Sequence, residues 1–256
     1  PMSMHFGAPC TPLVKAGDEV KVGQKIGEFR GLGAPIHASV SGKVKAVEPR
    51  PYSMGGNITS VIIENDFQNT LSEEVQAPAN PDALTPDQMV EIVKNAGIVG
   101  MGGATFPTHV KISGGIGKVD TVIINGAECE PLLRVDQQLM DLQAEKLLTA
   151  LDLIVDQVGA EKGVVALKEH YHAAAESLRK ALPAHPKLSV HLLGAFYPAG
   201  DEQVIVYEVT GRIVPEGGIP LAVGVVVTNV ETALNVLDAS QGKPVVEKYV
   251  TLTGAV

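Results

Sequence analysis

The chain has few cysteines. Of its 256 residues only Cys10 and Cys129 are cysteine, and they lie far apart in the sequence. Two thiols cannot build a disulfide framework, and an iron–sulfur cluster held by cysteines alone needs more of them. The sequence therefore excludes both kinds of site from these residues. Because the chain begins Pro-Met-Ser-Met and ends in a strand-like run, we expect a fragment of a longer polypeptide.

Aromatic residues and positive charge are also scarce. Aromatic residues make up 4% of the chain, tryptophan is absent, and 45% of the residues are hydrophobic. This composition is typical of an α/β protein with an aliphatic core. The net charge of −9 argues against a broad nucleic-acid surface. No apolar run is long enough to span a membrane and no signal peptide opens the chain, so we expect a cytoplasmic protein.

Glycine, by contrast, is abundant and gathers between residues 97 and 103, where four glycines occur in seven residues. Such a stretch turns tightly, reaches positive φ and approaches a ligand closely. A helical pattern with a capped start at residues 85–88 precedes it, whereas the dinucleotide fingerprint needs a strand there. We expect Pro107 to open the next helix and Lys111 to follow one turn later. The pattern favours a phosphate-bearing cofactor, and a plain connecting loop is the alternative.

The first 65 residues predict a small β module. Residues 14–27 and 34–47 alternate apolar and polar side chains around glycine turns, and residues 61–63 complete the sheet. The two halves resemble a biotinyl/lipoyl-like barrel-sandwich hybrid. A carrier domain of that type bears its prosthetic group on a lysine between the halves. Residues 28–33 contain no lysine, so we expect a structural or docking role.

A linker is predicted over residues 66–84, and an α/β domain over residues 85–256. The domain is expected to be a mostly parallel, Rossmann-like sheet with helices on both faces. Its strands are predicted at residues 119–124, 163–167, 188–193 and 223–228. Its helices are predicted at residues 136–158, 169–182, 200–210 and 231–238.

Ligands of such sheets bind beyond the carboxyl ends of the strands. Residues 125–131, 196–202 and 228–232 are expected at those ends. Together with the glycine stretch, they are the predicted walls of one site.

Four motifs carry a resemblance to a known family. They are GMGGATFPT at residues 100–108, NGAECEP at 125–131, YPAGDE at 197–202 and TNVET at 228–232. Their order is similar to that of the family containing the RnfC component of the Rnf electron-transport complex and the NADH-binding flavoprotein subunit of respiratory complex I. The β module also resembles RnfC. Soluble reductases share the motifs, among them a cobalamin reductase and an electron-transfer protein associated with D-proline reductase.

The resemblance implies an FMN-dependent oxidoreductase that takes hydride from NADH. Because hydride passes directly between stacked rings, no general base is needed and the catalytic residues act by positioning. The resemblance gives this positioning role to Glu130 and Glu202. The residues implied to bind FMN or NADH are Gly100, Gly102, Gly103, Ala104, Phe106, Lys111, Asn125, Glu128, Tyr197, Gly200, Asp201, Asn229 and Thr232.

The same resemblance implies an onward electron route. The expected partners are NADH and an electron-acceptor protein or other subunits of an electron-transfer complex, with the chain cytoplasmic or peripheral to the membrane. Family members continue into a region with four-iron clusters, so 4Fe–4S clusters are expected only in a missing C-terminal region.

Two residues depart from the family pattern. Thr105 stands where glycine is usual, and its branched side chain would crowd the nucleotide or the flavin. Ala127 stands where the flavoprotein of complex I has aspartate, which removes one carboxylate. The alternative to the enzyme is therefore a non-catalytic docking or scaffold module that has lost flavin binding.

Three residues of the second motif have other interpretations. Glu128 and Glu130 could form the acid–base pair of a hydrolase, but no nucleophile accompanies them. Cys129 could be a redox thiol, but packing beside the loop is favoured.

Two further groups concern helix starts. Asp201 and Glu202 could be ordinary first-turn acids that complement a helix dipole, and this alternative stays open. His170 and His172 lack an acidic or cysteine partner at ligand spacing, so no metal site is predicted.

Overall fold

The structure, a computed structural model, describes residues 1–53, 55–80 and 83–254. The chain divides into two compact units, and each is described by itself. The first unit comprises Pro1–Leu84, Gln88–His109 and Asp238–Lys248, and the second Thr85–Asp87, Val110–Leu237 and Tyr249–Val256. These limits differ from the predicted domain boundaries, which stay a prediction. Residues 81–82 of the predicted linker and residues 255–256 lie outside the described residues.

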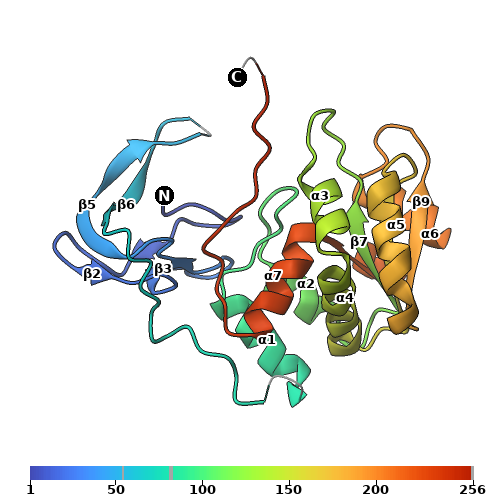
Figure 1. The fold of residues 1–256 in the computed structure, drawn as a ribbon, viewed down its shortest axis with the longest axis horizontal. Coiled ribbons are helices and arrows are strands. Elements are labelled where there is room, and N and C mark those ends of the chain that lie inside the picture. Colours follow the sequence, from blue (N-terminus) through green and yellow to red (C-terminus); the bar gives the residue numbers. More distant parts are fainter. Residues whose placement is uncertain (54, 81–82, 255–256) are drawn as a thin grey trace. The chain divides into compact units, whose positions relative to one another are not determined.

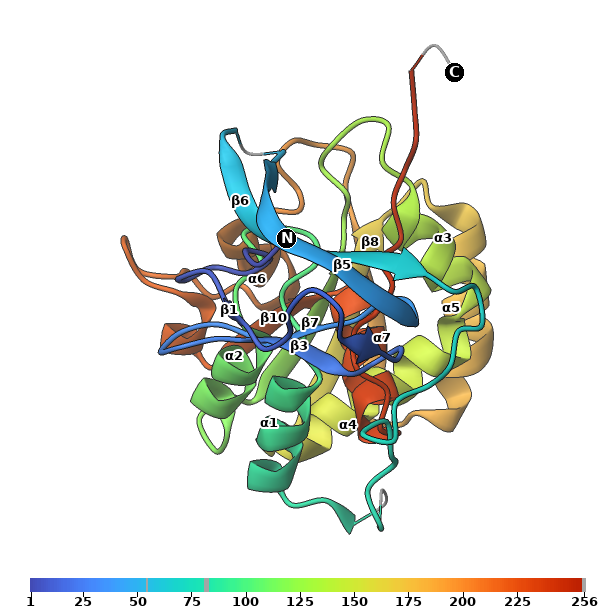
Figure 2. The same ribbon diagram turned by 90° about the vertical axis from the view of Figure 1, so that its left-hand side faces the viewer.

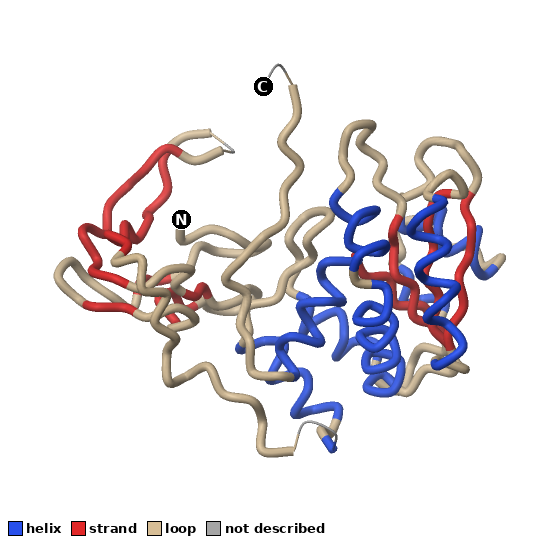
Figure 3. Tube along the Cα trace, in the orientation of Figure 1, coloured by secondary structure: helices blue, strands red, loops and turns tan. Residues whose placement is uncertain are grey.

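The β module of the first unit consists of small antiparallel sheets (Figure 3). Strands β1 (Thr11–Pro12), β3 (Lys25–Glu28) and β4 (Ile36–His37) form one sheet, and β2 (Glu19–Val20), β5 (Gly42–Pro51) and β6 (Asn57–Asn65) form another. Their inward-facing side chains share one core, made of Met2, Cys10, Val20, Ile26, Ile36, Ala38 and Val44. The barrel-sandwich hybrid expected from the two halves is confirmed.

Part of the predicted linker is held against this module. The backbone N–H of Val22 donates to the carbonyl of Thr70 at 2.9 Å, and that of Ser72 donates to the carbonyl of Val22 at 2.8 Å. A Cβ on Gly23 would lie 2.4 Å from the Val75 side chain. Residues 70–75 are therefore fixed to the β module.

The glycine stretch follows α1 (Pro86–Asn95), whose Met89 and Val93 are buried as predicted. Backbone bonds from Gly100 N to Phe106 O and from Thr108 N to Ile98 O close residues 98–108 into a loop. Pro107 lies in this closure and pairs with Val99. Helix α2 (Thr108–Gly115) thus begins one residue after Pro107, and the expectation that Pro107 is its first residue was wrong.

The second unit contains a four-stranded parallel sheet in the order β10-β7-β8-β9, of which β7 and β9 are labelled in Figure 1. Its strands are β7 (Thr121–Gly126), β8 (Lys162–Lys168), β9 (Leu188–Leu193) and β10 (Val225–Asn229). Its helices are α3 (Val135–Leu142), α4 (Ala144–Val158), α5 (His172–Ala181), α6 (Glu202–Thr210) and α7 (Val230–Ser240), with the short η2 (Leu182–Ala184) and η3 (Pro220–Val223).

Helices cover both faces of this sheet, as predicted. Figure 2 shows α6 on one side of the strands, and α3 and α5 on the other. On the α6 side, Ile205 and Val206 share a core with Ile123 and Val227. On the opposite side, a Cβ on Gly126 would lie 2.4 Å from Met140 of α3. The sheet is therefore the middle layer of a three-layer α/β unit.

The single helix predicted over residues 136–158 is two helices. Gln143 leaves the helical region with φ −126° and ψ 31°, so α3 ends and α4 begins there. Helix α3 packs mainly against α5, and α4 packs against α5 and also against β7, β8 and β9. Because of this break, each helix can orient its apolar face towards its own neighbours. Within the described residues, no helix combines the length and apolar character that crossing a membrane requires.

Candidate functional site

The carboxyl edge of the sheet contains a topological switch point. From β7 the chain crosses to β8 and β9 on one side and later returns to β10 on the other side of β7. Ligands of open α/β sheets bind in the crevice at such a reversal. Asn125 and Asn229, the last polar residues of β7 and β10, are register partners there. The fold therefore places two predicted site residues side by side at the position where a ligand is expected.

Asn125 locks the loop after β7 to the segment before α6. Its Oδ1 accepts from the backbone N–H of Ala127 at 3.0 Å, and its Nδ2 donates to the carbonyl of Gly200 at 2.8 Å. Gly200 must be glycine for this approach, because a Cβ would lie 2.2 Å from the Ala127 carbonyl and 2.8 Å from Cys129 Sγ. Cys129 thus packs beside Gly200, as the packing interpretation predicted.

Glu128 holds the N-terminus of α3. Its side chain is buried, and its two carboxylate oxygens accept from the backbone N–H groups of Asp136 at 3.0 Å and Gln137 at 3.2 Å. Lys168, at the end of β8, donates through Nζ to the carbonyl of Glu128. Both carboxylate oxygens accept hydrogen bonds within the protein, so the structure gives the Glu128 side chain a positioning role, and its implied hydrogen bond to a flavin stays a prediction.

Asn229 organises the start of α7 in the same way. Its Oδ1 accepts from the backbone N–H of Thr232 at 3.2 Å, and its Nδ2 donates to Asp136 Oδ2 at 2.7 Å. Thr232 is only 1% exposed, and its Oγ1 donates to Asn229 Oδ1 at 3.4 Å, so its side chain is part of this cap. Because the N-terminus of a helix favours an anion, the start of α7 places a positive dipole end at the switch point.

Lys111 contacts β10 two residues before the end of that strand. Its Nζ donates to the carbonyl of Val227 at 2.9 Å and pairs with Glu202 Oε1 at 2.8 Å. Asp201 caps α6, accepting from the backbone N–H groups of Gln203 and Val204. The first-turn interpretation therefore describes Asp201, whereas Glu202 is the partner of the predicted phosphate-binding lysine.

Two other predicted residues of this unit present exposed side chains. Tyr197 is 79% exposed and Glu130 is also exposed. They have the access that contact with a ligand requires.

The five predicted residues of the glycine loop, Gly100, Gly102, Gly103, Ala104 and Phe106, lie in the first unit. Gly97 is needed by the fold, since φ is +76° and a Cβ would lie 2.6 Å from the Pro35 carbonyl. Gly103 has open space where a Cβ would be. The positive φ expected in this stretch also occurs at Thr105, at +53°, although a β-branched residue disfavours it.

Several residues beside these groups were not predicted from the sequence. Asp136 links Asn229 to the start of α3, and Lys168 holds the Glu128 carbonyl. In the first unit, Phe6 contacts Phe106, and Lys248 Nζ lies 3.4 Å from the carbonyl of Met101. Only Lys168 had a usable signal, because it directly follows a buried parallel strand.

Both units of the chain match known families. Residues 93–238 match the family described as the Nuo51 FMN-binding domain, which covers more than half of the chain. The chain belongs to the Nuo51 FMN-binding domain family. Residues 1–68 of this Nuo51-family chain match the RnfC barrel sandwich hybrid domain. The predicted family is confirmed, and the match supports an FMN-containing electron-transfer component.

Named relatives of this Nuo51-family chain are oxidoreductase components. It is 46% identical over 257 residues to the C component of the Na⁺-translocating ferredoxin:NAD⁺ oxidoreductase complex of Acetobacterium woodii, covering 99% of this chain and 58% of the relative. It is 48% identical over 167 residues to the cobalamin reductase PduS of Citrobacter freundii, covering 65% and 36% respectively. The Nuo51-family chain therefore spans little more than half the length of the Acetobacterium relative.

Among solved structures, the Nuo51-family chain is similar to an NAD⁺-reducing [NiFe]-hydrogenase in its air-oxidized state. The TM-score is 0.54 at 26% identity, over 60% of this chain and 30% of the hydrogenase chain. The H₂-reduced state gives a TM-score of 0.52 at 27% identity, over 64% and 33%.

Proposed function

We propose that the chain binds FMN at the carboxyl edge of its parallel sheet, takes hydride from NADH, and passes the electrons to an iron–sulfur or protein acceptor. The observation that supports this most is the switch point between β7 and β10, where Asn125 and Asn229 are register partners. The family match supports FMN, and the hydride donor and acceptor are our inference.

The residues at this edge fit the chemistry of FMN. A phosphate needs a cation and oriented donors, and Lys111 and the N-terminus of α7 supply these kinds of group. A flavin also needs hydrogen bonds to its ring edge. Because Asn125 and Glu128 fix the loop at residues 125–129, its backbone is held ready for that task without further ordering.

Further predicted residues, in the glycine loop and beside the sheet, are assigned to the dinucleotide. The turn at Gly102–Gly103 lets backbone approach the ligand, and Phe106 offers an apolar ring. Glu130 and Glu202 orient the nicotinamide nucleotide, and Tyr197 covers it from the segment before α6. Bound FMN would supply the two-electron acceptor chemistry. These residues would bring the reacting rings together and keep water away from them.

The acceptor lies outside this chain in our proposal. The Acetobacterium relative belongs to an ion-translocating complex and is longer than the chain. We propose that 4Fe–4S clusters in a part of such a protein that this chain does not span, or another protein of such a complex, receive the electrons at the cytoplasmic face of the membrane.

Reconstitution with FMN tests the proposal. The purified chain is expected to retain FMN with its visible absorbance, and anaerobic NADH is expected to bleach it. Failure of the folded chain to take up FMN would instead support the alternative, a docking module that has lost flavin binding. The ion pair between Lys111 and Glu202 is the observation that favours this alternative, since it neutralises the predicted phosphate-binding charge.

A further inference from the structure

Phe6 is an exposed aromatic side chain in a chain with few aromatic residues. It is 55% exposed and is not among the buried residues of the β-module core. The segment that contains it is nevertheless fixed. The backbone N–H of Met2 donates to the Thr59 carbonyl at 2.8 Å, and that of Cys10 donates to the Met2 carbonyl at 2.6 Å. The ring is thus held on the surface by an ordered backbone.

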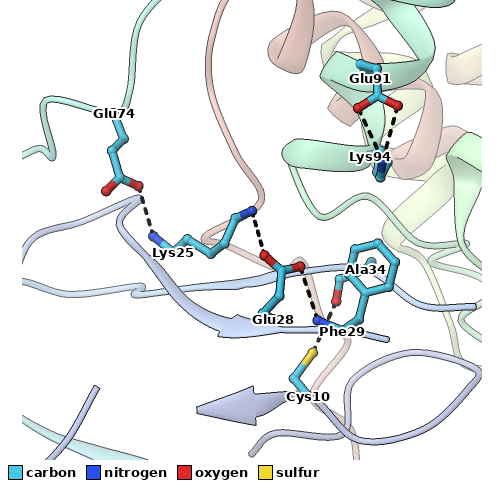
Figure 4. Close-up of polar contacts among 8 residues, drawn as sticks. All are labelled: Cys10, Lys25, Glu28, Phe29, Ala34, Glu74, Glu91 and Lys94. Atoms are coloured by element: carbon cyan, nitrogen blue, oxygen red, sulfur yellow. Dashed lines mark hydrogen bonds and ion pairs between the residues drawn. The ribbon is translucent and has the colours of Figure 1, made fainter. Parts of the chain in front are cut away.

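The residues on both sides of Phe6 are anchors. His5 is buried, and its Nε2 lies 3.3 Å from Cys10 Sγ. The Cys10 thiol donates in turn to the Ala34 carbonyl at 3.4 Å (Figure 4). Burial, with the Glu28 carboxylate as a second cause, raises the pKa of Cys10 to about 11, so this thiol is neutral and serves packing.

Gly7 completes the anchoring on the other side. Its φ is +129°, and a Cβ would lie 2.1 Å from the Leu32 carbonyl. Only glycine permits this approach. The chain therefore turns sharply directly after Phe6 and presents its ring outward.

Phe6 also contacts the glycine loop. Its backbone N–H donates to the carbonyl of Thr105 at 2.9 Å. Its ring lies beside the Phe106 ring, with centroids 6.2 Å apart and planes inclined by 39°. Lys248 Nζ lies at the carbonyl of Met101 in the same loop. Two apolar rings, a turn with open space at Gly103 and an ammonium group therefore belong to this loop or contact it.

We propose that Phe6 is a further nucleotide-binding residue, which with Phe106 forms an aromatic pair that stacks against a planar ring of the dinucleotide. The inference rests on the proposed function. A fixed, exposed aromatic ring keeps apolar surface in contact with water. Stacking on a heteroaromatic ring of a ligand would bury that surface. The Lys248 ammonium complements the phosphates of the same ligand. The carrier-less β module thereby contributes directly to the nucleotide site.

The test compares Phe6→Leu, Phe6→Tyr and Phe67→Leu in the full chain loaded with FMN. Phe67 is the matched control, because it is an 82% exposed phenylalanine of the same unit. NAD⁺ is titrated into each oxidised protein, and the FMN dissociation constant is measured separately. We expect NAD⁺ to bind Phe6→Leu about tenfold more weakly, a typical effect of losing one stacking ring. Phe6→Tyr and Phe67→Leu should stay within about twofold of the unchanged chain.

Each other outcome is decisive. Unchanged NAD⁺ affinity in Phe6→Leu, an equal loss in Phe67→Leu, or a parallel loss of FMN would overturn the inference, as would an unchanged chain that binds FMN but no NAD⁺. A chain that binds NAD⁺ without retaining FMN contradicts the proposed flavin function instead. The comparison of Phe6→Leu with Phe6→Tyr then still decides the role of Phe6.

Discussion

The sheet edge of the second unit and the glycine loop of the first unit are built in different ways. At the sheet edge, polar side chains are engaged by other groups of the protein, such as Glu128 by the start of α3 and Lys111 by Glu202. The glycine loop offers open space at Gly103 and holds Thr105 at an unfavourable φ of +53°. The two regions therefore suit different tasks: groups that are already ordered lose little entropy when they bind a ligand, and open backbone leaves room for one.

Removing the Glu128 carboxylate should disturb the ordered sheet edge of the second unit more than any other change considered below. In Glu128→Ala, two backbone N–H groups at the start of α3 lose their acceptor. We expect the free energy of unfolding to fall by about 3 kcal/mol, since each buried group left unpaired costs roughly 1–3 kcal/mol. Urea unfolding followed by circular dichroism measures this. Glu130→Ala is the matched control, because Glu130 is exposed and should change stability by less than about 0.5 kcal/mol.

Acid should weaken the β module that supports the glycine loop. Burial, with the Lys25 ammonium as a second cause, lowers the pKa of His37 from 6.5 to about 4, against smaller opposite effects of the Asn95 carbonyl and Glu28. Between pH 6.5 and 4, His37 is therefore protonated in the unfolded chain but neutral in the folded chain. Stability is full above pH 6.5 and is lost as the pH falls towards 4, by about 2 kcal/mol at pH 5.

A second half-buried histidine, His109, adds to this effect in the same direction. Burial and Lys94 lower the pKa of His109, and Glu91, which pairs with Lys94, opposes them (Figure 4). Unfolding midpoints measured between pH 7 and pH 5 should fall steeply in the unchanged chain and less in His37→Gln. A variant of an exposed histidine, His170→Gln, should keep the full pH dependence. Equal slopes in all three proteins would show that His37 does not carry the effect.

Removing the unfavourable backbone conformation at Thr105 should change the stability of the chain by a smaller amount. Glycine adopts φ +53° without the steric penalty of roughly 1–2 kcal/mol per residue, but it also loses more chain entropy on folding. We expect Thr105→Gly to stabilise the chain by at most about 1 kcal/mol, and Thr105→Ala to bring little gain because its φ stays unfavourable. A thermal unfolding series resolves the two. Destabilisation by Thr105→Gly would mean that its side chain supports the loop.

The sequence predicted the parts of this molecule that depend on local pattern. Apolar runs such as residues 163–167 predicted the parallel strands, and Asp201 at a helix start pointed to its cap. The break at Gln143 depends on which partners α3 and α4 meet, so no local pattern shows it. The pairing of Lys111 with Glu202 joins residues far apart in the chain, and only the folded sheet brings them together.

Lys111, which pairs with Glu202, also offers the most direct test of whether FMN binds at the sheet edge. The FMN dissociation constant is measured for the unchanged chain, for Lys111→Ala, and for Lys118→Ala, whose lysine is exposed just before the opposite end of β7. A charge-assisted bond to a phosphate contributes roughly 1.5–3 kcal/mol, so Lys111→Ala should bind FMN at least about tenfold more weakly while Lys118→Ala binds it normally. Equal FMN affinity in all three proteins would contradict the account.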